Sequence, residues 1–475
     1  MDFRNLCQFC ASRFVGPKPG LRKRKISAIA GAIALTFGGV SAAQALDLVQ
    51  SYRLALANDS TYQAALAANR AGHEAVPQAL AQLLPNLSAS GSRSKNSTNS
   101  NSPGFGGQRN LSTSDYTSSS STLALRQPLF RMYNFALYKQ AQSQEKNADA
   151  VLDKDRQDLL VRLSGAYFEA LMAQEQIALI LAQKEAYSAQ LQGAKRAFAA
   201  GVGTRTDIDD AQARYDMSVA QELEARQNVG YTRRQLQVIV NQPVEQLALL
   251  DAKRMELLPP VPANPDEWIA RGEENNAELR ALQANIEWAQ QELEKARAGH
   301  YPTVDLFVQR SKSESDTNYT INSQYLTTAA GVQFNIPIWS GGYVNSQMRQ
   351  AVANLEKVRQ QYEARRREVG QQVRKEFQNV AEGVLKVKAL EQAERSADQA
   401  VFSNQKGFQA GTRTQIDILN AQQQRMNVRR DLAQARYQYL LARVRLQGLM
   451  NSLNEDEMTL INSWLSEPVA LKERV

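Results

Sequence analysis

The chain has 475 residues, a length that allows two or three ordinary domains. Of these residues 43% are hydrophobic, and the formal net charge is +8. The positive charge would favour a nucleic-acid partner, but residues 1–45 contain seven basic residues and one acidic residue. The remaining sequence has 49 basic and 47 acidic residues and is close to neutral, so its charge gives no reason to expect nucleic acid.

Residues 1–45 have the features of a secretory signal peptide. A basic run at 22–25 precedes an apolar stretch at 26–40, and Ala43-Gln44-Ala45 provides a small-x-small cleavage site. An apolar stretch of about 15 residues is short for a membrane span, although a membrane anchor is the alternative. We therefore expect an exported protein.

The residues that usually bind metals are scarce. Both cysteines, Cys7 and Cys10, lie in the predicted signal peptide, so a mature chain starting near Leu46 would have no disulfide, no thiolate site and no lipid-bearing cysteine. The two histidines, His73 and His300, are too few for a metal site. With no nucleophile elbow, phosphate loop or paired carboxylates, the sequence predicts no cofactor and no enzyme.

Two long segments predict unusually long helices. Residues 134–198 and 343–407 each run about 65 positions without proline, and either would form a helix about 98 Å long. In the last helical segment two apolar stripes repeat every seven residues. They are Leu419, Met426, Ala433 and Leu440, and Val428, Ala435, Ala442 and Leu449. Two stripes on one helix predict two helical neighbours, as in the wall of a cylinder, with an ordinary bundle core as the alternative.

Four short segments alternate between apolar and polar residues, as outer-membrane strands do. Their apolar positions are Leu87, Ala89, Gly91, Leu123, Leu125, Val304, Leu306, Val308, Ala330, Val332, Phe334, Ile336 and Ile338. The polar segments Ser94–Asp115 and Ser311–Gln324 between them are predicted to be solvent-facing loops. Four strands cannot close a barrel, and open sheet edges are not tolerated in lipid. We expect two, three or four copies to share one barrel.

The two halves of the chain resemble each other. The run AFAAGVGTRTDIDDAQ at 197–212 is echoed by GFQAGTRTQIDILNAQ at 407–422, and Leu84–Leu87 corresponds to Tyr301–Val304. We therefore expect an internal duplication in which each half forms a helix, a strand pair and two long helices. The predicted segments are a first-half helix at 46–84, strands and loop at 85–130, long helices at 131–241, a linker at 242–266, a second-half helix at 267–300, strands and loop at 301–339, long helices at 340–451 and a C-terminal segment at 452–475.

Several runs resemble the TolC family over essentially the whole mature chain. They are Ala298–Leu306, Ile336–Gln347, Gly407–Thr414, Ala435–Leu440 and Leu453–Asp456. The resemblance implies a mainly α fold with a membrane β-barrel, namely a homotrimer with a 12-stranded outer-membrane barrel continuous with a helical periplasmic tunnel. It also implies a passive exit duct for type I protein secretion or multidrug efflux, surrounded by outer-membrane lipid. The partners would be an inner-membrane ABC or RND-type transporter and a periplasmic adaptor. The alternative is a trimeric structural or adhesive fibre without a lumen.

The repeated turns at 199–206 and 409–414 connect the long helices. We expect their glycines to allow the chain reversal and their threonines to cap the helices that follow, although helix punctuation alone would explain both. These residues are Gly201, Gly203, Gly411, Thr206 and Thr414. Acidic residues come next, and the helix dipole favours them there. In several copies they would form a ring that favours cations.

The TolC resemblance makes these turns a periplasmic gate. The gate residues so implied are Thr206, Asp207, Asp210, Phe408, Arg413, Asp417 and Asn420. In the family, links between neighbouring coiled coils close the gate through the residues matched by Arg413, Thr206 and Asp207. This chain departs from the family at Phe408, where a tyrosine is usual, and at Asn420, where a second aspartate is usual.

Overall fold

The structure is a computed structural model that describes residues 45–103, 109–317 and 319–466. All but the last position of the predicted signal peptide at 1–45 lies outside these residues, as do Cys7 and Cys10. Among the helices in the described ranges, none is both long and apolar enough to cross a bilayer.

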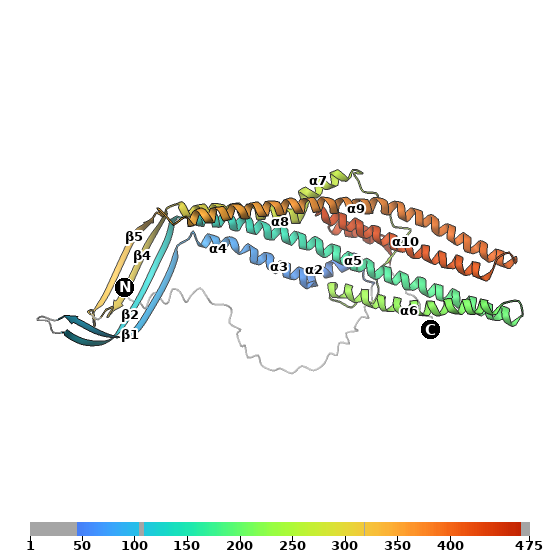
Figure 1. Ribbon diagram of the computed structural model, residues 1–475, viewed down its shortest axis with the longest axis horizontal. Helices are drawn as coiled ribbons and strands as arrows, with labels where there is room; N and C mark the ends of the chain where they lie inside the picture. The colour runs from blue at the N-terminus through green and yellow to red at the C-terminus, as the bar shows by residue number, and fades with distance from the viewer. Residues whose placement is uncertain (1–44, 104–108, 318, 467–475) are drawn as a thin grey trace, which may run out of the picture. The chain divides into compact units, whose positions relative to one another are not determined.

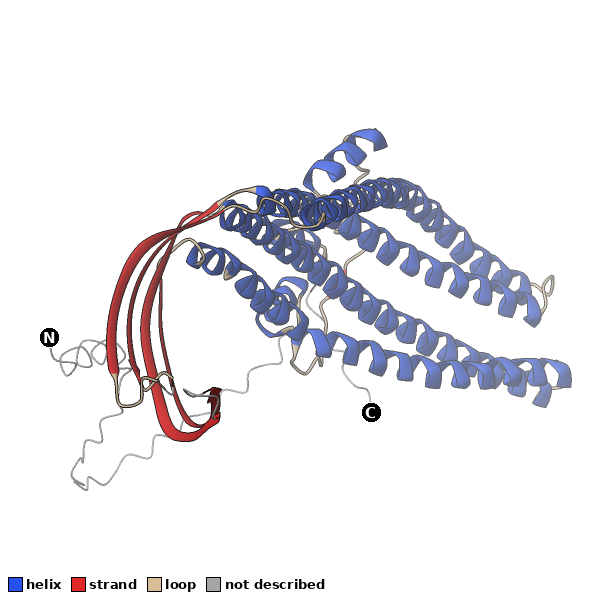
Figure 2. Ribbon diagram, turned by 60° about the vertical axis from the view of Figure 1, so that its left-hand side comes forward, coloured by secondary structure: helices blue, strands red, loops and turns tan. Residues whose placement is uncertain are grey.

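Four antiparallel strands form one curved sheet (Figure 2). They are β1 (Asn86–Pro103), β2 (Arg109–Phe130), β4 (Thr303–Glu314) and β5 (Gln324–Asn335). Their order is β1-β2-β4-β5, so the strand pairs of the two halves of the chain meet where β2 pairs with β4. Strands β1 and β5 are the two edges of this sheet.

Three predictions about the strands are wrong in detail. The segment Ser94–Asp115 is mostly strand rather than loop, because the β1–β2 ladder continues to the pair Pro103 and Arg109, supported by side-chain bonds such as Thr113 to Asn99 at 2.8 Å. The second predicted loop, Ser311–Gln324, begins and ends within strands. Ile336 lies just beyond the end of β5, since the proline that follows it has no N–H to continue a ladder.

Two very long helices run from the sheet into helical hairpins (Figure 1). Helix α5 (Met132–Ala199) turns into α6 (Arg205–Val240), and α9 (Tyr343–Gln409) turns into α10 (Gln415–Leu449). Helix α10 packs against both α9 and α5. The residues of its two heptad stripes are buried or, at Leu449, partly buried, which confirms the prediction of two helical neighbours.

The two predicted single helices before the strands are broken. The segment 46–84 forms α2 (Leu48–Asn58), α3 (Ser60–His73) and α4 (Ala75–Ala81), and 267–300 forms α7 (Pro265–Asn275), α8 (Ala277–Arg297) and η1 (Ala298–His300). Asp59 has an extended ψ of 114° and caps α3 by accepting from the Tyr62 amide at 2.8 Å. Asn276 caps α8 in the same way. Such polar side chains compete with the helical hydrogen bonds and start a new helix.

The main hydrophobic core lies where the long helices cross the linker and the C-terminal segment. Strand β3 (Leu249–Leu250) of the linker pairs with β6 (Leu465–Ser466), and α11 (Glu455–Ser463) packs on α2. The buried Tyr167 hydroxyl lies 3.0 Å from the Leu46 carbonyl oxygen. This core fixes the helices in their middle, and the two hairpin turns lie beyond it (Figure 1).

Candidate functional site

Each hairpin turn ends in a reciprocal helix cap. At the start of α6 the Thr204 hydroxyl accepts from the Asp207 amide at 3.1 Å, and the Asp207 carboxylate accepts from the Thr204 amide at 3.0 Å. At the start of α10, Thr414 and Asp417 make the same pair of bonds. The prediction that Thr206 caps α6 is therefore wrong, because Thr206 already lies inside the helix.

The three predicted turn glycines have two different roles. Gly201 and Gly411 have φ angles of +75° and +74°, a left-handed conformation that glycine adopts without the steric cost of a Cβ. Gly203 has no such angle. A Cβ at Gly203 would lie 3.0 Å from the backbone nitrogen of Phe198. Gly203 therefore provides space for a close approach of the chain to the end of α5.

The acidic residues of the turns are exposed or half-buried, and one of them, Asp417, has a lowered pKa. Hydrogen bonds from the Thr414 backbone and hydroxyl, with the charge of nearby Arg413, lower the pKa of the half-buried Asp417. Asp209 pairs with Arg205 one helical turn away at 3.3 Å, with both side chains mostly exposed. The half-buried Asp210 has no salt bridge among the described residues. Asp417 thus combines a capping role with a stable negative charge.

The predicted latch between Arg413 and Asp207 is not formed within one copy. Among the residues that the structure describes, Arg413 makes no salt bridge, and its side chain is exposed. The Asp207 carboxylate instead caps α6. Phe408, at the end of α9, is 45% exposed. In one copy, Arg413 and Phe408 are therefore exposed, and Asp207 is half-buried.

A different bond connects the two hairpins inside one copy. Arg214 of α6 donates to the Asn420 side-chain oxygen of α10 at 2.9 Å. Asn420, where the family usually has an aspartate, thus accepts from a charged guanidinium but adds no negative charge of its own. Sequence reasoning missed Arg214, because its partner is more than 200 residues away and belongs to no local pattern.

Amide side chains continue this contact along the seam between α5 and α10. Gln190 donates to Gln422 at 2.5 Å, and Gln423 accepts from Tyr187 at 2.7 Å and from Gln183 at 3.1 Å. Ion pairs instead join α9 to α10, where Arg429 contacts Glu394 and Asp398. The first hairpin also has an internal ion pair, between Lys184 and Glu222, whereas the bonds named between the hairpins contain no ion pair.

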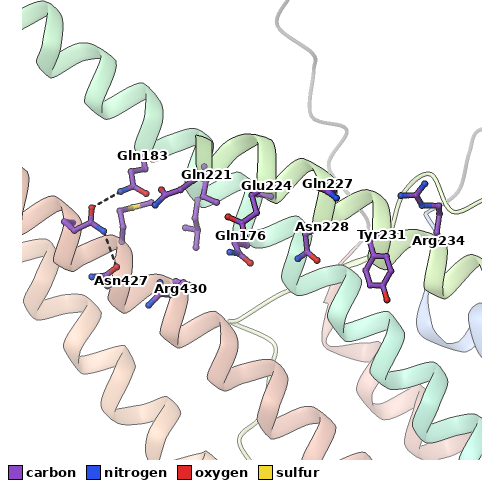
Figure 3. Close-up of a pocket in the computed structure, with 15 residues that line it drawn as sticks. Gln176, Gln183, Gln221, Glu224, Gln227, Asn228, Tyr231, Arg234, Asn427 and Arg430 are labelled. Carbon is purple, nitrogen blue, oxygen red and sulfur yellow. Dashed lines mark hydrogen bonds between the residues drawn. The ribbon is translucent and has the colours of Figure 1, made fainter. Parts of the chain in front are cut away.

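A hollow of 640 Å³ opens beside this seam, between α5, α6 and α10 (Figure 3). Most of the side chains labelled in Figure 3 are amides, and most of the labelled residues belong to α6. They are Gln176, Gln183, Gln221, Glu224, Gln227, Asn228, Tyr231, Arg234, Asn427 and Arg430. Among the residues of the described ranges, no cluster of three or more His, Cys, Asp or Glu side chains is arranged to hold a metal ion. The hollow is lined by both polar and apolar side chains and lacks the geometry of a metal centre.

One face of the sheet is apolar and exposed. The register places Leu306 opposite Val332 and Val304 opposite Phe334, and residues opposite each other point to the same face. Exposed apolar residues on this face are Leu87, Leu123, Leu125, Leu306, Val308, Leu326, Val332 and Phe334. The other face carries mainly serine, threonine, asparagine and glutamine. The sheet therefore has an apolar side and a polar side, as a barrel wall between lipid and water requires.

A buried carboxylate connects the polar side of the sheet to α5. Asp305 of β4 is 2% exposed and accepts from Arg126 of β2 at 2.6 Å and from Arg131 at 2.6 Å and 2.8 Å. Arg131 is the residue immediately before α5. The sequence analysis did not predict this cluster, because its members are up to 179 positions apart.

Comparisons with known proteins match this architecture. The family model described as outer membrane efflux protein matches residues 51–242 and 268–452. The chain is 33% identical to the proteases secretion protein PrtF of Dickeya chrysanthemi, over 93% of this chain and 96% of that protein. It is 35% identical to the alkaline protease secretion protein AprF of Pseudomonas aeruginosa, over 88% of this chain and 87% of that protein. It is 31% identical to the outer membrane protein TolC of Escherichia coli, over 92% of this chain and 89% of that protein.

Solved structures share the fold at lower identity. The outer-membrane channel OprN has a TM-score of 0.73 and 17% identity, with 92% of this chain and 99% of that chain covered. The Campylobacter jejuni CmeC outer membrane channel also has a TM-score of 0.73, with 15% identity and 94% and 98% coverage. The fold is that of the TolC-like outer membrane channels, and the chain is located in the outer membrane. The extent of the family match and of the three relatives shows that this chain belongs to the outer membrane efflux protein family.

Proposed function

We propose that this chain is the outer-membrane exit duct of a type I protein secretion system. Three copies would form a 12-stranded barrel in the membrane, continuous with a helical tunnel in the periplasm. The single observation that carries the proposal is the four-stranded sheet with an exposed apolar face, a polar opposite face and two long helical hairpins attached to it.

The sheet edges argue for a shared barrel. Within one copy, β1 and β5 each pair on one side only. Unpaired backbone groups cost several kcal/mol each in lipid. Pairing β5 of one copy with β1 of the next would satisfy both edges, and a barrel needs about eight or more strands. Two, three or four copies meet this condition, and the resemblance to the TolC family favours three.

An internal duplication is supported by matching backbone geometry at corresponding positions. Asn241 and Asn451, which lie 210 positions apart, both have a φ of 52°. Gly201 and Gly411 lie the same distance apart and share a left-handed conformation. The repeated halves would give each copy two hairpins, and three copies would give the tunnel a quasi-sixfold wall.

The hairpin turns are proposed to be the periplasmic gate. Arg413 of one copy would meet Asp207 of another, and the Asp417 carboxylates would form a ring around the axis. Charge-assisted bonds of this kind are individually modest in water, so a docking partner is able to open them. Channels of this family work with inner-membrane transporters and adaptors, and an ABC or RND-type transporter with a periplasmic adaptor would open this gate.

The relatives indicate the class of cargo. PrtF and AprF are named for the secretion of proteases, and each aligns with most of this chain. We infer that the cargo is a secreted protein, with a protease as the leading candidate. A fibre without a lumen is not favoured, because the structural neighbours are channels.

Two measurements test this function. Purified protein in planar bilayers is expected to show single-channel conductance, and its mass in detergent is expected to equal three chains. Expression in a Pseudomonas aeruginosa strain without AprF is expected to restore extracellular alkaline protease. If the protein inserts and conducts but no protease is exported, the cargo assignment is wrong. A strictly monomeric, non-conducting protein would contradict the duct itself.

A further inference from the structure

We propose that the exposed face of the sheet binds the phosphate groups of a phosphorylated glycolipid in the outer leaflet of the membrane. The binding residues are Arg93 and Lys95 of β1 and Arg310 and Lys312 of β4, here called the basic rim. The proposal rests on the proposed function only for orientation, because the helices must lie in the periplasm for the rim to lie near the outer leaflet.

The strand register places the basic rim on the apolar face. Leu125 of β2 lies opposite Leu87 of β1 and Val308 of β4, so these three side chains share that face. Side chains two residues apart on a strand point to the same side. Arg310 is two residues after Val308, and Arg93 is six residues after Leu87. Both arginines, and the lysine two residues beyond each, therefore project from the face that carries the apolar band.

The rim also lies at the outer part of that band: Arg310 and Lys312 are level with its outer residues Leu123 and Leu326, and Arg93 and Lys95 lie beyond the apolar residues of β1. Strand β4 leaves the helical part at Thr303 and runs away from it, so Arg310 is about 7 Å farther out along the strand than Val308. On β1 the last exposed apolar side chain before Arg93 belongs to Leu87. Long basic side chains at such a boundary keep their stems on apolar surface and extend their charges to the polar headgroups.

The four cations are free to bind an external anion. All are exposed, and within the described part of the chain none makes a salt bridge or a side-chain hydrogen bond. Two carboxylates lie nearby on the same face. Asp115 is farther from the apolar band than Lys95, whereas Glu314 is at the level of Arg93, because both lie opposite Ser119. The rim therefore keeps an excess of positive charge at the level of the headgroups.

The spacing of the rim suits a headgroup with two phosphates. The β1 and β4 pairs are separated by β2, and the register sets the β1 pair farther out along the strands, so the nearest members, Arg93 and Lys312, lie roughly 12 Å apart. Between them β2 presents the hydroxyls of Ser119 and Ser121, which lie opposite Arg93 and Lys312 respectively. A hollow of 660 Å³ adjoins the β1 pair and is lined by Arg93 and Lys95 together with Asp115 and Glu314. A sugar headgroup with a phosphate at each end would contact both pairs and the hydroxyls between them.

The test compares two lipids on the full-length, detergent-solubilised oligomer. We expect lipid A with two phosphates to bind at least ten times more tightly than the same lipid without phosphates, since each basic residue near an anionic headgroup contributes roughly a fivefold gain. The variant R93Q/K95Q/R310Q/K312Q is expected to lose this preference. The control R349Q/K357Q/R359Q/K386Q removes four exposed charges from α9, none with a salt bridge among the described residues, and is expected to keep it.

Three results would overturn the inference. They are equal binding of the two lipids by the unchanged protein, an equal loss of preference in the control variant, and binding of inorganic phosphate alone as tightly as the phosphorylated lipid. The last result would show a simple anion site. Conductance in planar bilayers is measured in parallel. A protein that conducts normally but does not distinguish the two lipids would refute the basic rim and leave the duct intact.

Discussion

Thr414 and Asp417 bind each other in both directions at the start of α10. The Asp417 carboxylate accepts from the Thr414 amide at 2.8 Å and from its hydroxyl at 2.9 Å, while the Thr414 hydroxyl accepts from the Asp417 amide at 3.3 Å. The same carboxylate is the proposed ring charge of the gate. Any test of the ring must therefore separate the loss of charge from the loss of the cap.

Asp417→Asn separates the two roles, because asparagine keeps an oxygen that can cap α10 but has no charge. We predict that this variant is blocked less by a trivalent cation applied from the periplasmic side in planar bilayers. Asp417→Ala should show the same weaker block and, in addition, lose about 1 kcal/mol of stability with the cap. If Asp417→Asn is blocked as strongly as the unchanged channel, the ring does not exist.

The pH dependence of the block follows from the lowered pKa of Asp417. A carboxylate with a lowered pKa stays charged when the pH falls through the usual aspartate range, and it loses its charge only at lower pH. The block is therefore expected to persist on acidification to about pH 4. The Thr414→Ala variant removes the hydroxyl that lowers the pKa, so its block should be lost at a higher pH than in the unchanged channel.

The gate latch is tested by replacing Arg413 and Asp207. We predict that Arg413→Ser combined with Asp207→Asn raises the resting conductance in planar bilayers, because the closed state loses its links between copies. Asp207→Asn keeps the oxygen that caps α6. Thr204→Ala is the matched control, since it weakens that cap without changing any charge. Unchanged conductance in the double variant, or an equal rise in Thr204→Ala, would show that Arg413 and Asp207 do not form the latch.

The caps show where sequence reasoning succeeded and where it failed. The long helices, the strands and the apolar face follow from periodicity, which each local segment carries within itself. The prediction that Thr206 caps α6 was wrong. The repeat distance of 210 that matches Asp207 with Asp417 also matches Thr204 with Thr414. Reading the repeat position by position would have found the correct cap. Contacts such as Arg214 with Asn420 depend on how two distant hairpins pack, and no local pattern predicts them.

Asp305 is predicted to be important for the connection between the sheet and α5. Asp305→Ala would leave Arg126 and Arg131 without their buried partner. We expect the free energy of unfolding to fall by about 2–3 kcal/mol. This loss is near the lower end for a broken buried pair, because both arginines reach water. The measurement is a urea titration of the protein in lipid vesicles.

The control for Asp305 is Arg374→Ala. Arg374 pairs with Asp266 at 2.8 Å, but the two side chains are 56% and 72% exposed. Exposed pairs contribute little, so this variant should change the free energy of unfolding by less than about 1 kcal/mol. Equal effects of the two substitutions would mean that burial of the Asp305 carboxylate does not matter for stability.

His73 provides a pH-dependent link between α3 and α5. Its two ring nitrogens lie 2.7 Å from carboxylate oxygens of Glu145 and Asp149, so the ring donates twice and is positively charged in this arrangement. Its pKa is raised, chiefly by the bond to Asp149. A raised pKa means that the link contributes fully below the unfolded value of about 6.5 and is lost as the pH rises through the folded value. We therefore predict that amide protection factors in α3 fall as the pH rises above neutrality.

Hydrogen exchange at several pH values measures this effect, with protection factors corrected for the intrinsic rate of exchange. The control is His73→Gln, which keeps a polar side chain of similar reach but has no titrating group. At acidic pH, the α3 amides of His73→Gln should be less protected than those of the unchanged chain. Their protection should then stay constant as the pH is raised. Because α4 follows α3 directly and leads into β1, loosening of α3 should extend to the α4 amides. If His73→Gln shows the same pH profile as the unchanged chain, another group controls the stability of this helix.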